Sequence, residues 1–259
     1  MISIIISTHN SEFFQDVSQN IKETIGVEYE IIAIENHNRY SICEAYNLGS
    51  EQAKYNYLCF MHEDVFLKTK NWGAKLIDIM NSDASIGLIG IAGSKFKSTY
   101  PTTGWGTGPF VSRFWRGHHF SGKELPKHVE LDTSIHKKET DDVLIVDGVF
   151  MFTKRIVLQS CRFDDLKLTH FHGYDTDFSL QVYFQSYRVI VFRGLELIHF
   201  SYGDLGDEFA KANRTIQKKW LSKLPIATKD CKLNSIQRSY YNVLIWSGYL
   251  LNALKRKLK

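Results

Sequence analysis

The residues most able to do chemistry lie in a short segment, Phe60-Met61-His62-Glu63-Asp64-Val65, which closes an apolar run. The run predicts a buried strand, so these acidic side chains are expected at its carboxyl end, where open α/β sheets bind ligands. Divalent cations such as Mg²⁺ and Mn²⁺ bind carboxylate oxygens and substrate phosphates together. The segment therefore predicts a cation site that serves a phosphate-bearing ligand. The alternative is an acidic turn that only faces solvent.

A second set of candidate residues lies in the later half of the chain, again at the ends of expected elements. Asp147 interrupts an apolar run, Asp175 and Asp177 open a helical pattern, and His199 closes a short strand pattern. A carboxylate within reach of a hydroxyl group can act as a general base. Aspartates also stabilise helix N-termini, where the helix dipole favours negative charge, so simple capping is the alternative for Asp175 and Asp177.

Hydrophobic periodicity predicts the elements that must position these residues. Apolar, largely β-branched runs predict buried strands over 2–7, 29–34 and 57–61. Helical spacing follows the first two, over 13–25 and 42–54, with Ser11 as the expected N-cap of the first helix. Strands separated by helices imply right-handed crossovers and a mostly parallel central sheet flanked by helices. The predicted fold class is therefore α/β.

The rest of the chain predicts a helix over 72–80 and a buried strand over 86–92, and then loses its periodicity between 93 and 142. Such a long irregular stretch in a compact domain is usually a functional loop or disordered. A strand pattern returns over 143–153, broken at Asp147 and Gly148, and two short strands are expected around Gly194. We expect one domain over 1–204 and a C-terminal helical extension over 205–259, with helices at 209–224 and 236–258.

Composition excludes several classes of protein. With 44% hydrophobic and 23% charged residues, the 259-residue chain is typical of a globular protein with one main core. Its net charge of +4 is too small and too scattered to indicate a nucleic-acid partner. The four cysteines, Cys43, Cys59, Cys161 and Cys231, show no paired spacing, and the first residues show no signal-peptide pattern. We therefore expect a cytoplasmic protein.

Taken in order, these segments resemble the family 2 glycosyltransferases with the GT-A fold. The resemblance is based on residues 2–10, 30–36, 45–49, 57–64, 147–151 and 174–178, and it reaches His199. Each motif is short, but their order and spacing together are specific. The resemblance implies a Rossmann-like GT-A domain that transfers a sugar from a nucleoside-diphosphate sugar, with UDP favoured, to a hydroxyl acceptor with inversion. The product would be a surface polysaccharide or another glycan.

The resemblance also assigns residues to the nucleotide-sugar donor. Thr8 and Glu35 would hold the base and the ribose, and Asn47 and Gly49 would shape the same pocket. Glu63 is placed on the donor side with them.

For the cation, the resemblance implies that Asp64 binds the metal, since His62-Glu63-Asp64 falls at the family's Asp-x-Asp motif. His199 matches the late histidine that completes the metal site. His62 replaces the first acid of the motif and could itself be a ligand. An imidazole suits Mn²⁺ better than Mg²⁺, which prefers oxygen, so Mn²⁺ is the expected cofactor.

Asp175 falls on the aspartate that acts as the base, and Tyr174 stands where an acid commonly precedes it. Attack of an alcohol on an anomeric carbon needs a carboxylate near the hydroxyl proton and a cation that stabilises the departing diphosphate. Asp147 and Asp177 are expected on the acceptor side, with Asp177 as an orienting or helix-opening group.

Trp105 and Trp115, in the irregular region 93–142, are candidates to stack on an acceptor sugar. The alternative is that they form a small hydrophobic cluster under a long loop. The other histidines of the chain show no zinc-binding spacing.

Other functions and contacts stay open at this point. A sugar nucleotidyltransferase would need a Gly-rich basic loop after the first strand, which Thr8-His9-Asn10-Ser11 does not provide. A non-catalytic nucleotide- or glycan-binding module would agree with His62 and Tyr174. The segment 236–258 could lie on the inner face of the plasma membrane and bring the enzyme to a lipid-linked acceptor. It could instead pack on the core or form a homodimer.

Overall fold

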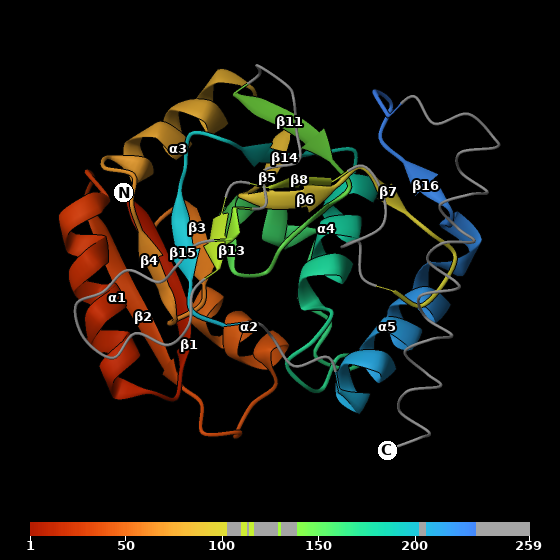
Figure 1. The fold of residues 1–259 in the computed structure, drawn as a ribbon, viewed down its shortest axis with the longest axis horizontal. Helices are drawn as coiled ribbons and strands as arrows, with labels where there is room; N and C mark the ends of the chain where they lie inside the picture. Colours follow the sequence, from red (N-terminus) through yellow and green to blue (C-terminus); the bar gives the residue numbers. More distant parts are fainter. Residues whose placement is uncertain (103–109, 113, 117–128, 131–138, 202–205, 232–259) are drawn as a thin grey trace.

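The computed structural model describes residues 1–102, 110–112, 114–116, 129–130, 139–201 and 206–231. In this part of the chain a seven-stranded sheet forms the centre (Figure 1). Its strands, in spatial order, are β11 (Thr140–Val143), β14 (Arg188–Phe192), β5 (Ile86–Gly90), β13 (Phe150–Lys154), β3 (Tyr57–Met61), β1 (Ile2–Thr8) and β2 (Tyr29–Glu35).

Most strands of this sheet run in one direction, as the sequence predicts. β1 pairs in parallel with β2 and β3, and β14 pairs in parallel with β5. β13 is inserted between β3 and β5 and is antiparallel to both, and β11 is antiparallel to β14. The carboxyl ends of β1, β2 and β3 therefore meet at one edge of the sheet.

Helices cover both faces of the sheet and bury two hydrophobic clusters. On one face, α1 (Ser11–Thr24) and α3 (Trp72–Ser82) pack against Ile2, Ile4 and Ile6 of β1. On the other face, α2 (Ile42–Gln52), α4 (Tyr174–Phe184) and α5 (Asp207–Trp220) share a cluster with Ile5. Alternate residues of β1 thus face opposite layers, as expected for a strand buried on both sides.

Two local predictions are wrong, for reasons of pairing and capping. The strand β2 is an edge strand rather than a fully buried strand, since within the described residues it pairs only with β1. Its residues Ile32 and Ile34 are buried, but Glu35 is exposed. The N-cap of α1 is Asn10 rather than Ser11, because the Asn10 side chain accepts hydrogen bonds from the backbone N–H groups of Glu12 and Phe13.

Short strands form three smaller sheets. They are β10 (Val129–Glu130), β9 (Phe114–Arg116), β15 (Leu197–His199) and β4 (Val65–Leu67) in one, β12 (Ile145–Val146), β6 (Ala92–Ser94) and β8 (Phe110–Ser112) in another, and β16 (Ile226–Ala227) with β7 (Phe96–Lys97). Several of these strands lie within 93–142, so the described parts of that region are more regular than predicted. Strands of two or three residues leave no detectable periodicity in a sequence.

Described residues between 206 and 231 pack on the main core. Ile216 and Trp220 of α5, and Leu224 after the 3₁₀-helix Leu221–Lys223, belong to the same cluster as α4. A second 3₁₀-helix, Arg155–Gln159, follows β13. The helix predicted over 236–258 lies outside the described residues, and the domain boundary at 204 stays a prediction. No helix in the described part is long and apolar enough to cross a membrane.

Candidate active site

The acidic segment lies in the connection between β3 and β4, where successive side chains point in different directions. The His62 backbone N–H donates to the Val149 carbonyl oxygen at 3.2 Å, which continues the β3–β13 ladder past the strand end. His62 and Asp64 face β15, whereas Glu63 turns back toward β1. One short segment therefore supplies two different parts of the site.

His62, Asp64 and His199 converge into a cluster with metal-ligand character. His199 Nε2 lies 3.3 Å from Asp64 Oδ1 and 3.4 Å from His62 Nδ1, and His62 Nδ1 lies 3.7 Å from the same Asp64 oxygen. Pairing of β15 with β4 produces this alignment, with the Phe200 N–H donating to the Asp64 carbonyl oxygen at 2.9 Å. Among the described residues this is the only such group of His, Cys, Asp or Glu side chains.

The protonation states of this cluster suit a cation. Burial lowers the pKa of His62 to about 4, although the Asp64 carboxylate opposes that change, so the imidazole is neutral at pH 7. Burial alone would raise the pKa of Asp64, but the hydrogen bond and charge of His199 outweigh it and bring the pKa to about 2. A neutral imidazole and an ionised carboxylate are the forms that bind metal.

The ligand atoms also fit a divalent cation geometrically. One atom from each of His62, Asp64 and His199 lies within 4.8 Å of the others, close enough to surround one ion with room for further ligands. Two nitrogens and one oxygen are a donor set that suits Mn²⁺ better than Mg²⁺. The three residues expected from the sequence at the metal are thus brought together.

Glu63 organises the loop after β1. Its buried carboxylate accepts hydrogen bonds from the Thr8 hydroxyl and from the backbone N–H groups of His9 and Asn10, and it pairs with His9 Nδ1 at 2.8 Å. Glu35 lies beside Thr8 in the β1–β2 register, with its side chain exposed at the same sheet edge. Thr8, Glu35 and Glu63 are therefore adjacent, and Glu63 contributes by fixing the loop.

Asp175 lies in the first turn of α4, facing the break between β12 and β13. Its carboxylate accepts hydrogen bonds from the backbone N–H groups of Thr176, at 2.7 Å, and of Gly148. Gly173 precedes the helix with φ of 85°, a left-handed conformation that favours glycine. Burial, helped by the negative charge of Asp147, raises the pKa of Asp175 to about 7. Asp175 is nevertheless partly exposed to solvent.

A direct contact joins the metal-ligand cluster to the Asp175 side. His62 Nε2 lies 2.6 Å from the hydroxyl oxygen of Tyr174, the residue before Asp175. The charge of Asp147 acts on both His62 and Asp175. The carboxylates of Asp64 and Asp175, far apart in the sequence, therefore lie on either side of one His62–Tyr174 pair.

Asn47 and Gly49 were expected to shape the donor pocket, and the structure gives both a packing role. The Asn47 side-chain NH₂ donates to the Phe163 carbonyl oxygen and to Asp165, each at 2.9 Å. A Cβ atom at Gly49 would lie 2.3 Å from Ile5 Cγ2, so glycine is needed there for α2 to approach β1. Both residues therefore hold α2 in place, and their part in shaping a donor pocket stays a prediction.

Asp177 was expected on the acceptor side as an orienting or helix-opening group, and the structure places it in the first turn of α4 with its side chain toward α5. Its buried carboxylate accepts hydrogen bonds from Lys219 Nζ, Trp220 Nε1 and Gln181, each at 2.8 Å. Residues two apart on a helix point to nearly opposite sides, so Asp177 faces α5 when Asp175 faces the sheet edge. Asp177 therefore fastens α5 to α4.

Of the two candidate tryptophans, the structure describes only Trp115. Trp105 lies outside the described residues. Trp115 lies on β9, opposite Ile198 of β15, which brings its backbone next to the strand that carries His199. The stacking role of both tryptophans stays a prediction.

Two residues at the site had no role in the sequence-based prediction. Tyr174 contacts His62, and its position directly before Asp175 was a usable signal. Phe171 is half exposed, with its ring centroid 5.4 Å from that of His62. Nothing in the sequence distinguishes Phe171 from other aromatic residues in loops.

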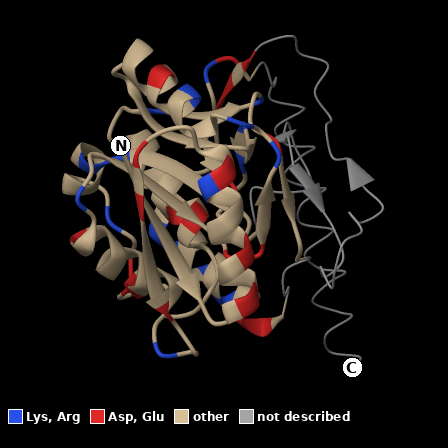
Figure 2. Ribbon diagram, turned by 90° about the vertical axis from the view of Figure 1, so that its left-hand side faces the viewer, with Lys and Arg blue, Asp and Glu red and all other residues tan. Residues whose placement is uncertain are grey.

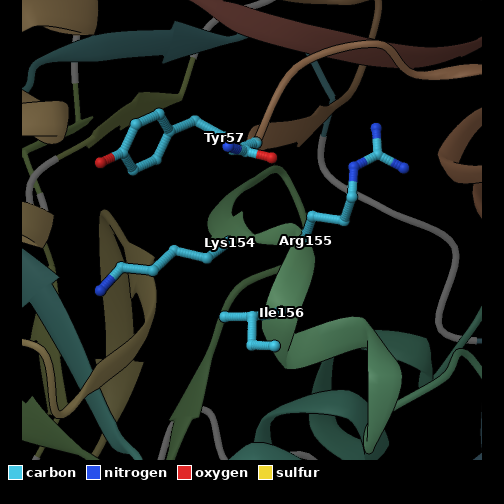
Figure 3. A pocket seen from close by; sticks show the side chains of 5 residues that line it. Tyr57, Lys154, Arg155 and Ile156 are labelled. Atoms are coloured by element: carbon cyan, nitrogen blue, oxygen red, sulfur yellow. The ribbon is translucent and has the colours of Figure 1, made fainter.

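A surface pocket lies elsewhere, at the start of β3 and the end of β13 (Figure 3). It is lined by Asn56, Tyr57, Lys154, Arg155 and Ile156 and has a volume of ≈ 320 Å³. Arg155 points away from Lys154 and donates to the carbonyl oxygens of Ala53 and Tyr55. The Arg155 side chain of this pocket thus stabilises the fold.

The charged residues of the described ribbon are mixed in sign, with Lys and Arg interspersed with Asp and Glu (Figure 2).

The chain belongs to the Glycosyltransferase like family, whose family model matches residues 3–223. This confirms the resemblance to family 2 glycosyltransferases, and with it a GT-A α/β fold.

Solved structures agree on the fold. One similar structure is GalNAc-T7 with UDP, GalNAc and Mn²⁺, at a TM-score of 0.58 and 14% identity, covering 86% of this chain and 49% of that one. Another is TarS of S. aureus, at a TM-score of 0.52 and 11% identity, covering 93% of this chain and 42% of that one. The chain thus spans about half of these relatives or less. No curated protein sequence matches it closely.

Proposed function

We propose that this protein transfers a sugar from a nucleoside-diphosphate sugar, with UDP as the nucleotide, to a hydroxyl acceptor with inversion of the anomeric centre. The observation that carries the proposal is the contact between His62 and Tyr174, which links two unlike carboxylates: Asp64 beside His62, and Asp175 directly after Tyr174. Asp64 is strongly acidic and lies among histidines, while Asp175 has a pKa near 7. In such a pair, the more acidic carboxylate can bind the cation and the other can remove a proton.

Asp175 is the proposed base. A carboxylate with a pKa of about 7 takes a proton from an acceptor hydroxyl more readily than an ordinary aspartate, while half of the molecules still carry it ionised at pH 7. The N–H groups of Gly148 and Thr176 hold the carboxylate in place. As Asp175 takes the hydroxyl proton, the acceptor oxygen would form its bond to the anomeric carbon on the face opposite the C–O bond to the diphosphate, which breaks, and this gives inversion.

His62, Asp64 and His199 would hold the divalent cation. A bound cation would supply positive charge to the diphosphate of the donor as it departs. The two imidazoles favour Mn²⁺, and GalNAc-T7, which shares the fold, was solved with UDP and Mn²⁺.

Thr8 and Glu35 would face the nucleotide at the ends of β1 and β2. Glu63 keeps the loop that carries Thr8 in shape, and the exposed Glu35 carboxylate is available to the ribose hydroxyl groups. Asp147 would lie toward the acceptor, next to Asp175.

The acceptor and the location complete the proposal. An acceptor glycan, free or lipid-linked, would reach the site past β9 and its Trp115. We place the protein in the cytoplasm, with the segment 236–258 as a contact to the inner face of the plasma membrane or to a second copy.

The experiment is a release assay for UDP from a panel of UDP-sugars, with Mn²⁺ or with EDTA. We expect release with at least one sugar in Mn²⁺ and none in EDTA. Asp64→Asn should lose the Mn²⁺-dependent release, while Glu51→Gln, an exposed substitution on α2, should keep it. Release that EDTA leaves unchanged, or binding of UDP with no release from any donor, would contradict a metal-dependent transferase.

A further inference from the structure

The contact between His62 and Tyr174 joins two positions at which the chain departs from the family pattern. His62 stands at an acid position of the metal motif, and Tyr174 stands at an acid position before the base. In the structure the two side chains meet, with 2.6 Å between His62 Nε2 and the tyrosine oxygen. A distance this short indicates a strong hydrogen bond, whichever group donates.

The direction of this hydrogen bond decides whether His62 can bind a cation. A neutral imidazole carries one N–H and one lone pair, so each nitrogen determines the role of the other. Nδ1 is the nitrogen that faces Asp64 and His199. It can bind a cation only if the proton is on Nε2, and Nε2–H then needs an acceptor.

Tyr174 is held where it can be that acceptor. It is 4% exposed, begins α4, and packs edge-on against the ring of Tyr46 at a centroid distance of 5.6 Å. Gly148 leaves space for the hydroxyl group, because a Cβ atom there would lie 2.2 Å from the tyrosine oxygen. The tyrosine oxygen is therefore fixed by packing and cannot easily follow a moving histidine.

We propose that Tyr174 is a positioning residue that accepts a hydrogen bond from His62 Nε2 and thereby presents the Nδ1 lone pair to a cation shared with Asp64 and His199. The inference depends on the proposed cation site and adds a specific role to it. Metal-binding histidines commonly donate their second N–H to an oxygen acceptor, and loss of that acceptor weakens metal affinity about 10- to 100-fold. A tyrosine in this role makes a nitrogen-rich site possible where the family uses an acid.

The test measures Mn²⁺ affinity of the full chain by calorimetry and nitrogen coupling to bound Mn²⁺ by pulsed electron paramagnetic resonance. The wild type should show coupling to two histidine nitrogens. Tyr174→Phe should bind Mn²⁺ about 10- to 100-fold more weakly and lose one of the two couplings, and His62→Ala should lose the same coupling. Tyr57→Phe, which removes a hydroxyl group at the opposite end of β3, should change neither quantity.

A double-mutant cycle separates positioning from damage to the fold. Aspartate at position 62 would place an oxygen near the present Nδ1 but would be too short to reach Tyr174. In the His62→Asp background, Tyr174→Phe should therefore change Mn²⁺ affinity less than about twofold. An equal loss in both backgrounds, or two nitrogen couplings retained in Tyr174→Phe, would overturn the inference. A single coupling in the wild type would also overturn it, while Mn²⁺-dependent UDP release would still support the proposed function.

Discussion

At the scale of single residues, Asp175 combines a functional advantage with a cost to the fold. Burial and the neighbouring Asp147 disfavour its ionised form, and this raises its pKa to about 7. A carboxyl group whose pKa is higher in the folded than in the unfolded chain binds its proton more tightly when folded. Folding stability therefore falls as the pH rises from about 4 to about 7 and stays reduced above that.

The first prediction concerns this loss of folding stability at higher pH. Asp175→Asn should raise the melting temperature at pH 8 in EDTA, because the amide keeps the hydrogen bonds from Gly148 and Thr176 without a buried charge. The difference from wild type should shrink as the pH falls below 7 and disappear near pH 4. Calorimetric melting across this pH range is the measurement, and equal melting temperatures at all pH values would contradict the raised pKa.

The second prediction concerns His62 and the choice of cation. His62→Asp replaces a nitrogen ligand by the oxygen that Mg²⁺ prefers, so it should raise the ratio of Mg²⁺ affinity to Mn²⁺ affinity. Equilibrium dialysis with each metal measures both affinities. His170→Asp, a substitution at an exposed histidine, is the control. An unchanged ratio would mean that His62 does not bind the cation.

At the scale of elements, two segments create the site. The β3–β4 connection presents His62 and Asp64 to β15, and the first turn of α4 brings Tyr174 and Asp175 to the break between β12 and β13. The β3–β4 connection is held by strand pairing on both sides, and the α4 turn is held by the contact of Tyr174 with His62 and by the bonds to Asp175. The elements next to them secure these positions, and α5 is the clearest case.

The third prediction tests that support. Asp177→Ala removes the common partner of Lys219 and Trp220. The variant leaves the Trp220 Nε1–H without this acceptor and leaves Lys219 paired with Asp164 alone, which should cost about 1–3 kcal/mol of unfolding free energy. Urea denaturation provides the value. Glu51→Ala breaks the exposed Arg162–Glu51 pair and should cost about 0–1 kcal/mol. Similar losses in the two variants would show that Asp177 does not fasten α5.

Elements with sustained periodicity could be predicted from the sequence. The strands β1 and β3, the helix α5 and the break at Asp147 and Gly148 all appear where the pattern places them. The short strands within 93–142 could not be predicted, because their stability comes from partners distant in sequence, such as the pairing of β7 with β16. The edge position of β2 is likewise a property of the whole sheet.

The sequence could place candidate site residues only where they stand at the end of a strand or the start of a helix. Asp64, His199 and Asp175 stand at element ends, and the ends converge. Asn47, Gly49 and Asp177 lie inside helices, where the rotation of the helix decides which side chain faces the site. Helix spacing already places Asp175 and Asp177 on different sides of α4, so the contact of Asp177 with another element could have been anticipated.

At the scale of the whole molecule, the arrangement of the sheet explains why one edge carries all the chemistry. Parallel β1, β2 and β3 end together, and β15 adds His199 from a second sheet. Helical layers cover both faces of the sheet (Figure 1). In the proposed function, the nucleotide and the cation would meet where these strands end. Nucleotide and cation are therefore expected to stabilise the fold together.

The fourth prediction is a thermal shift with both ligands. At about 100 times its dissociation constant a ligand adds about 2.7 kcal/mol, so UDP with Mn²⁺ should raise the melting temperature by roughly 5–10 °C. Asp64→Asn should remove the part that depends on Mn²⁺. A shift of equal size with UDP in EDTA would separate nucleotide binding from the His62–Asp64–His199 cluster.

The central claim is that Asp64 and Asp175 serve one reaction, and the turnover of a UDP-sugar by Asp175→Asn tests it most directly. With Mn²⁺ present, the variant should bind UDP as tightly as the wild type, since its cation ligands are intact, while transfer should fall about 10²- to 10⁴-fold. Transfer at the wild-type rate by Asp175→Asn would contradict the account.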